Sequence, residues 1–317
     1  PRRPHAVRRP ARDQAQAPTL SSAVAMTNPS PAVEMSRRVV HVLHSGTFRR
    51  VAFTAWRGGA PRRAAICLHG HMEDGRELDP LARALAEEGW LVLCPDLAGH
   101  GLSDWCASAD DYRFATYAAD VSHLMAVAGS RRVDLIGLSM GGFVAMRLGS
   151  IAKAPIRSLV LGDAGAVRDP DAMRRVLGIA PTRAVYPDAA SAAAALRLFA
   201  SDRGPLPEDH WEELLRLRLV RTPDGVRFRF DPRLVQLAGE GTARALDRWH
   251  VWNAIRAPTL LIRGERSHML TAEHADEMVR SRPGAELLTL PGVGHPPWLR
   301  TPDQIAPIVA WLKQLPD

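Results

Sequence analysis

Cysteine is scarce in this sequence, which has three among 317 residues, at positions 67, 94 and 106. The three form an odd set without metal-type spacing, and two of them fall in predicted strands. We therefore expect buried free thiols and a reducing, cytoplasmic setting. The chain also has no run of about 18 apolar residues, so it contains no segment that is typical of a membrane-spanning helix.

Acidic residues are nearly missing from the first 38 positions, where seven arginines face only Asp13 and Glu34. This stretch holds +5 of the formal net charge of +7, and the remainder is close to neutral. The positive charge alone would suggest a nucleic-acid partner, but it lies in a Pro-, Ala-, Arg- and Ser-rich tail without apolar periodicity or interleaved aromatics. We therefore predict a disordered tail over residues 1–37 and no nucleic-acid partner.

The first residue of the tail is Pro1, whereas methionines follow at positions 26 and 35. We expect the first 25 residues to be sequence upstream of the natural start. A targeting peptide is the alternative, since the composition is Arg-rich and acid-poor, although the apolar region of a secretory signal is missing.

The rest of the chain has the length and the 46% hydrophobic content of a large globular domain with an insertion. Short runs of Val, Ile and Leu alternate with helical patterns, which favours an α/β protein with a mostly parallel sheet. Eight strands are predicted, over residues 38–45, 48–56, 63–69, 90–95, 132–138, 157–163, 259–264 and 285–292. Gly46 and Thr47 separate the first two strands, so we expect an antiparallel hairpin at one side. Helices are predicted over 77–89, 111–129, 140–153, 272–282 and 302–315.

The alternation stops between the sixth and seventh strands. Amphipathic helical pieces over 189–200 and 210–220 replace it, separated by Pro and Gly. The predicted organisation is thus a core of residues 38–165 and 253–317, with a helical lid formed by residues 166–252.

The strongest chemical signal is Gly-Leu-Ser-Met-Gly at 137–141, which matches G-x-S-x-G between a predicted strand and a predicted helix. Such a turn is too tight for side chains at its flanking positions and exposes the serine hydroxyl at the sheet's carboxyl edge. Ser139 is therefore the candidate nucleophile. A serine needs a base, and His295 follows the last strand at the same edge, in "LPGVGHPPWL".

An oxyanion needs preorganised donors, and the backbone amides of His71 and Met140 are the candidates. The chain turns after "ICLHGH" at the same sheet edge, and Met140 opens the helix after the serine. His69 and His71 could instead be metal ligands, but no third ligand follows at a useful spacing. We expect no metal and no cofactor.

Six motifs resemble the α/β-hydrolase family, of the esterase and lactonase type. They are "LHGHMEDGRELDPLARAL", "CPDLAGHGLSDW", "IGLSMGGFVAMRL", "SLVLGDAG", "APTLLIRGERSHML" and "PGVGHPPWL", in the family's order. The resemblance covers residues 38–315 and implies an eight-stranded sheet with a helical lid between strands six and seven. It is nearly silent on the substrate, although Ser139 argues against the dehalogenases and epoxide hydrolases, which use Asp there.

The sequence departs from the family at the third catalytic residue. Similar sequences carry Asp after strand seven, where this chain has His268, and a neutral imidazole supplies no negative charge to the base. Asp163, at the end of strand six, is the leading replacement, because some family members take their acid from there. Glu265 is a second candidate, and a third reading has no acid at all.

These residues predict a hydrolase that cleaves a small to medium ester, thioester or lactone through an acyl-enzyme. The alternative is a ligand-binding protein that kept the pocket and lost turnover with the acid. His268 and Glu265, together with Trp211 and Trp249 from the predicted lid, are candidate site-lining residues. The expected partner is a small ester-type molecule, and the sequence does not indicate an oligomeric state.

Overall fold

A computed structural model describes residues 32–181, 183–235 and 246–316, which all belong to one compact unit beginning at residue 31. The predicted disordered tail lies outside the described residues except for its last six positions. Those six belong to the fold, because the first strand begins at Val33 rather than at residue 38. Within the described ranges, no helix is long and apolar enough to cross a membrane.

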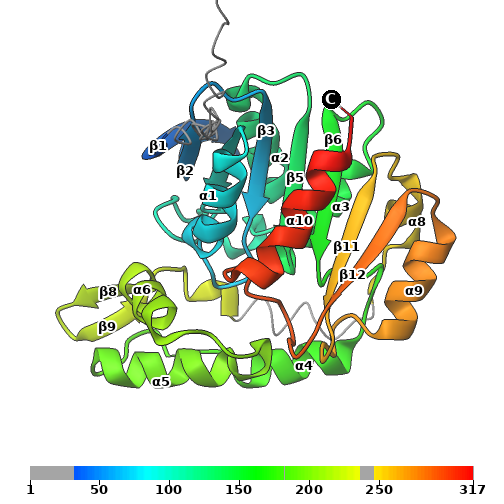
Figure 1. Cartoon of the computed structure of the whole chain (residues 1–317). Helices are drawn as coiled ribbons and strands as arrows, with labels where there is room; N and C mark the ends of the chain where they lie inside the picture. Colours follow the sequence, from blue (N-terminus) through cyan, green and yellow to red (C-terminus); the bar gives the residue numbers. More distant parts are fainter. Residues whose placement is uncertain (1–31, 182, 236–245, 317) are drawn as a thin grey trace, which may run out of the picture. The chain divides into compact units, whose positions relative to one another are not determined.

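An eight-stranded sheet forms the centre of the unit (Figure 1). Its strand order is β1-β2-β4-β3-β5-β6-β11-β12, and the first three strands pair antiparallel while the others pair parallel. In this order the strands span Val33–His44, Thr47–Gly58, Trp90–Pro95, Arg63–Leu68, Val133–Leu138, Ile156–Gly162, Thr259–Gly264 and Ala285–Leu290. The predicted α/β-hydrolase fold, with its hairpin at one side, is confirmed.

Helices cover both faces of the sheet. Helices α1 and α10 pack into one core, while α2, α3, α8 and α9 contribute to the core on the other face (Figure 1). Their bounds are Asp79–Glu87, Pro302–Gln314, Phe114–Ala128, Met140–Gly149, Trp249–Ala254 and Ala272–Ser281. Short 3₁₀ helices precede two of them, η1 at Gly75–Leu78 and η2 at Ala109–Asp111.

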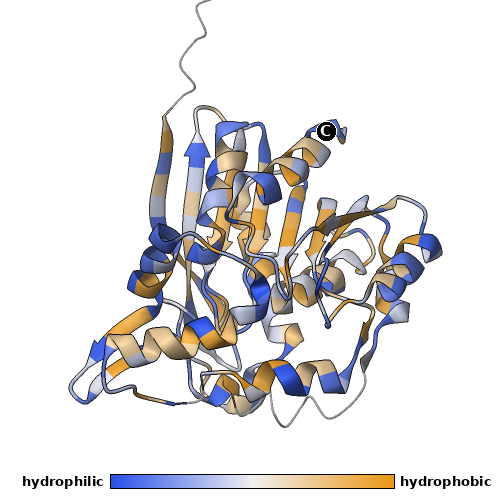
Figure 2. Ribbon diagram, turned by 60° about the horizontal axis from the view of Figure 1, so that its bottom comes forward, coloured by the Kyte–Doolittle hydropathy of each residue, from blue (hydrophilic) through white to orange (hydrophobic). Residues whose placement is uncertain are grey.

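The central strands supply both cores because successive side chains of a strand point to opposite faces. In β3, Ile66 and Leu68 enter the core with α2 and α3, whereas Ala65 and Cys67 enter the core with α1 and α10. The central strands are accordingly hydrophobic along most of their length (Figure 2). All three cysteines are free and buried, as predicted.

Residues 166–252, the inserted segment, connect β6 to β11 through helices and short strands. Within its described residues the elements are, in chain order, β7 (Val167–Arg168), α4 (Pro170–Gly178), α5 (Ala189–Phe199), η3 (Ser201–Arg203), α6 (Glu208–Arg218), β8 (Leu219–Thr222), β9 (Gly225–Phe228), β10 (Leu246–Asp247) and the first residues of α8. The two predicted helical pieces are confirmed as α5 and α6. The β8–β9 hairpin was not predicted, because the helical pattern in the sequence continues to residue 220, although α6 ends at Arg218.

Candidate functional site

Ser139 lies between the end of β5 and the start of α3, at the carboxyl edge of the parallel strands. Its backbone has φ +47° and ψ −110°, a strained conformation for a residue with a side chain. Glycine is required around it, because a Cβ on Gly137 would lie 2.3 Å from the carbonyl oxygen of Gly141, and one on Gly141 would lie 2.4 Å from that of Leu68. The G-x-S-x-G pattern therefore marks a turn that brings strand, serine and helix into close contact.

His295 follows β12 and reaches back to this turn. Its Nε2 lies 3.0 Å from Ser139 Oγ, although 156 residues separate the two in the sequence. The histidine side chain is only 7% exposed. A hydrogen bond of this length and polarity is the arrangement by which an imidazole can take a proton from a serine hydroxyl.

Asp163 follows directly after β6 and faces the other nitrogen of the same ring. Its Oδ2 lies 3.1 Å from His295 Nδ1, and its side chain is fully buried. Burial raises the pKa of Asp163 above its ordinary value, while hydrogen bonds from His295 and the Ser267 hydroxyl and the charge of Arg263 oppose this shift. The backbone of Asp163 has φ +56°, and its amide donates to the carbonyl oxygen of Ile262 on β11 at 2.7 Å. The carboxylate is thus held in place by its own strand and by the neighbouring one.

The two predicted oxyanion donors lie on segments that are tied together. The Gly141 amide, next to Met140, donates to the carbonyl oxygen of His69 at 3.1 Å. His71 is two residues further along, and both His71 and Met140 line the same cavity as Ser139. Burial lowers the pKa of the His71 side chain to about 4, so its ring is neutral near pH 7.

A cavity of about 420 Å³ opens over Ser139 and His295. Its walls are mostly apolar and combine core and inserted segment. The core contributes Phe114, Tyr117 and Phe143, and the inserted segment contributes Met173, Leu177 and Phe199. An apolar cavity with a few convergent polar groups is typical of a small-molecule site.

The four residues predicted to line the site are not among the residues that line this cavity. His268 is exposed, and Glu265 is exposed with its Oε2 accepting from the Gly292 amide at 2.7 Å. Trp211 is a buried residue of α6, with its ring centroid 5.3 Å from that of Trp298, and the ring centroid of Trp249 lies 5.5 Å from that of His274. The two tryptophans are packing residues because the apolar faces of their helices turn into the protein.

Five charged residues that were not predicted for the site line the cavity, and the two most deeply buried of them are Glu73 and Arg203. Both are buried, at 4% and 3% exposure. Arg203 lies in "SDRGPLPED", where no periodicity or motif distinguishes it from a surface arginine. Across the described ranges, no group of three or more His, Cys, Asp or Glu side chains could hold a metal ion.

Comparisons with known proteins bear on the fold and the family of the chain. Residues 65–308 match the family model described as "Alpha/beta hydrolase family". The chain is 33% identical over 279 residues to the 3-hydroxybutyrate-oligomer hydrolase of Cupriavidus necator, an alignment that covers 84% of this chain and 94% of the relative. Among solved structures, an alpha/beta hydrolase from Novosphingobium aromaticivorans is similar, with a TM-score of 0.77, 32% identity, and coverage of 89% of this chain and 99% of that one. An esterase from Exiguobacterium antarcticum shares the fold, with a TM-score of 0.66 at 19% identity and coverage of 84% and 97%.

Proposed function

The chain belongs to the alpha/beta hydrolase family and is a hydrolase of ester-type bonds, and we propose that it works through an acyl-enzyme on Ser139. One observation carries the proposal: His295 lies within hydrogen-bonding distance of Ser139 on one side, at 3.0 Å, and of Asp163 on the other, at 3.1 Å. This is the geometry of a nucleophile, a base and an orienting acid.

In the proposed reaction, Ser139 Oγ attacks the substrate carbonyl carbon while His295 Nε2 takes the hydroxyl proton. The oxyanion is held by the amides of His71 and Met140, and Asp163 stabilises the imidazolium through Nδ1. The alcohol leaves with the proton from His295. Water, deprotonated by the same nitrogen, then attacks the acyl-enzyme and releases the acid.

The cavity indicates which esters fit. Its apolar walls favour a small to medium substrate with an aliphatic acyl part, as an ester, thioester or lactone. The similarity to a 3-hydroxybutyrate-oligomer hydrolase makes short 3-hydroxyacid oligomers the first substrates to test. We also propose that the inserted segment acts as a lid, because α4 and α5 contribute walls of the cavity.

A fluorophosphonate probe tests the nucleophile directly. We expect rapid labelling of the wild-type chain and none in Ser139→Ala, with labelling strongly slowed in His295→Ala. Ser122→Ala is the matched control, since Ser122 is an exposed serine of α2 that bonds only the Ala119 carbonyl, and it should label at the wild-type rate.

A folded wild-type chain that does not label would support the ligand-binding alternative and overturn the proposal. Turnover of p-nitrophenyl esters of increasing chain length, beside lactones, thioesters and 3-hydroxybutyrate dimers and trimers, then ranks the substrates. Labelling without turnover of any of these would exclude the proposed substrate class while leaving Ser139 as the nucleophile.

A further inference from the structure

Arg203 projects from the inserted segment into the core, where it contacts two separate loops. Its Nη1 lies 2.6 Å from Glu73 Oε1, in the loop after β3. Its Nε donates to the Pro296 carbonyl oxygen at 2.9 Å and its Nη2 to that of Pro297 at 3.5 Å, both in the loop after β12. The guanidinium also lies over the Trp298 ring, 3.6 Å from its centroid. Every nitrogen of the guanidinium is therefore directed at one of these two loops.

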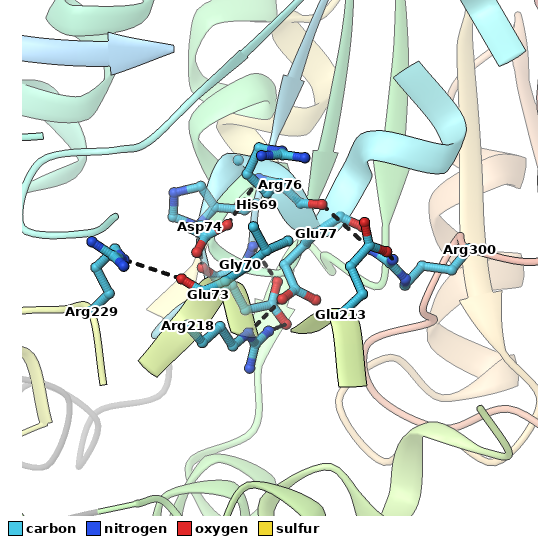
Figure 3. A network of polar contacts seen from close by, with 12 residues as sticks. His69, Gly70, Glu73, Asp74, Arg76, Glu77, Glu213, Arg218, Arg229 and Arg300 are labelled. Atoms are coloured by element: carbon cyan, nitrogen blue, oxygen red, sulfur yellow. Dashed lines mark hydrogen bonds and ion pairs between the residues drawn. The ribbon is translucent and has the colours of Figure 1, made fainter. Parts of the chain in front are cut away.

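Glu73 in turn contacts the backbone segment that carries the proposed oxyanion donor, His71. Its second oxygen, Oε2, accepts from the Gly70 amide at 2.8 Å, one residue before His71. A Cβ on Gly70 would lie 2.8 Å from this oxygen, so a larger residue there would push the Glu73 carboxylate out of its present position. Figure 3 shows Glu73 beside Gly70 and His69, whose carbonyl oxygen accepts from the amide of Gly141.

The second loop carries the proposed base, because Pro296 directly follows His295. An unbroken series of contacts thus runs from the Gly70 amide through Glu73 and Arg203 to the Pro296 carbonyl. No backbone hydrogen bond that the structure shows between described residues joins these two loops directly. Arg203, a side chain from a third part of the chain, joins Glu73 to Pro296. Further from the site, the Arg300 side chain after β12 donates to the carbonyl oxygens of Glu77 and Arg76 in η1, at 2.9 and 3.4 Å.

The contact between Glu73 and Arg203 is an ion pair of two buried side chains. Burial would raise the pKa of Glu73, but the guanidiniums of Arg203 and Arg218 hold it below its ordinary value, so the carboxylate is ionised near pH 7. Arg218 bonds Glu77 and lies 3.6 Å from Glu73, and Figure 3 shows it against both carboxylates. Of the two arginines, Arg203 is the one that also bonds the loop with His295.

We propose that Arg203 is a positioning residue that sets the spacing between the His71 amide and His295, so that the catalytic geometry is complete only when the inserted segment is docked on the core. The inference rests on the proposed function, because it assigns roles relative to Ser139 and His295. Its chemical basis is the planar guanidinium group, whose several N–H groups donate to a carboxylate and two carbonyl oxygens at the same time. A lysine, with one point charge, cannot do the same.

Kinetics of Arg203→Met and Arg203→Lys test the proposal on the preferred ester. A misplacement of about 1 Å costs on the order of 10²-fold in rate, so we expect kcat to fall about 10- to 100-fold in Arg203→Met at a nearly unchanged KM. Arg203→Lys keeps the positive charge and should show a smaller fall in kcat than Arg203→Met. A raised KM at unchanged kcat would make Arg203 a substrate contact and overturn the positioning role, as would wild-type kcat in both variants.

The matched control is Arg197→Met, the same change in the same segment. The Arg197 side chain is 41% exposed, pairs with Glu208 and lies over Trp211, and neither of these partners belongs to the two core loops. It should keep kcat within about twofold of wild type, as an exposed ion pair contributes little. If Arg203→Met does not fold, as judged by circular dichroism and tryptophan fluorescence, Arg203→Lys alone decides, and wild-type kcat in it overturns the proposal.

A double-mutant cycle with Glu73→Gln separates a shared link from two independent effects. Because both side chains act in one series of contacts, the double variant should lose no more than the worse single variant. Strictly additive losses would contradict the link. A wild-type chain that neither labels nor turns over would instead overturn the proposed function, which is a different outcome from an active chain that is indifferent to Arg203.

Discussion

Two neighbouring loops at the carboxyl edge of the sheet differ in what they present to His295. The loop after β6 begins with Asp163, which is buried and lies against Nδ1. The loop after β11 carries Glu265 and His268, both exposed, although β6 and β11 pair in parallel and end side by side. The ends of adjacent strands are close to equivalent in position, so the direction and burial of one side chain decide which loop can serve the base.

The second loop still contributes, through residues that contact the first. The Ser267 hydroxyl and the Arg263 guanidinium both favour the charged form of Asp163. Ser267 is buried, and its Oγ accepts from the amides of Met269 and Leu270 at 3.1 and 3.3 Å, so neither of these bonds uses its proton. The difference between the loops is therefore one of role: one presents the acid, and the other stabilises its charge.

The largest effect should come from Asp163→Asn. The amide cannot stabilise the imidazolium and favours the wrong tautomer, so kcat should fall on the order of 10⁴-fold, measured on a p-nitrophenyl ester. Activity within tenfold of wild type would show that His295 takes its acid from elsewhere and would remove the contrast between the loops.

Thermal unfolding is the control for this variant. The folded pKa of Asp163 is raised, so folding favours its protonated form and the ionised group opposes folding. The stability that the protonated carboxyl contributes to the folded state is fully present below its pKa in the unfolded chain. It is lost as pH rises through its pKa in the folded chain. The Tm of Asp163→Asn relative to wild type should therefore increase from acid to neutral pH. A lower Tm at neutral pH would attribute the lost activity to unfolding.

Ser267→Ala tests the supporting role of the second loop. Removing a hydroxyl that lowers the pKa of Asp163 should raise that pKa further, which moves the acid limb of kcat/KM to higher pH. We expect the loss of kcat/KM to be largest at the acid end of the profile and to converge toward wild type at high pH, where the carboxyl is ionised in both proteins. A uniform loss at every pH would mean that the substitution damages the loop rather than the charge of Asp163.

Glu265→Gln should have a small effect, on stability rather than on rate. Its carboxylate accepts from the Gly292 amide, and an amide oxygen can replace it with a weaker bond. We expect at most about 1 kcal/mol of lost stability by urea unfolding and an unchanged kcat. A large fall in kcat at unchanged stability would identify Glu265 as the acid after all.

His268→Asp should have the smallest effect, although it restores the residue that similar sequences carry. Asp163 already faces Nδ1, and an exposed carboxylate at 268 is solvated, so kcat/KM should stay within about twofold of wild type. The combination with Asp163→Asn sharpens the test. Recovery of most activity in that double variant would show that the two loops are interchangeable and that only the residue type separates them.

Local patterns in the sequence were sufficient for much of this protein. Hydrophobic periodicity identified all eight strands of the sheet, because each strand buries its own side chains over a short span. Gly137, Ser139 and Gly141 were identified because a strained turn limits the residues that can form it. The β8–β9 hairpin was missed, since its strands are only four residues each and β8 follows α6 without a break.

The sequence by itself determined the fold and the two residues expected to exchange a proton, Ser139 and His295. It left the catalytic acid open between Asp163, Glu265 and no acid at all. Both carboxylates lie at the same sheet edge, and the sequence does not show in which direction each side chain points. Only the tertiary structure decided that Asp163 faces Nδ1 and that Arg203 bridges two loops. These contacts join residues 93 to 132 positions apart, and their geometry depends on how strands, loops and the inserted segment pack together rather than on any local pattern.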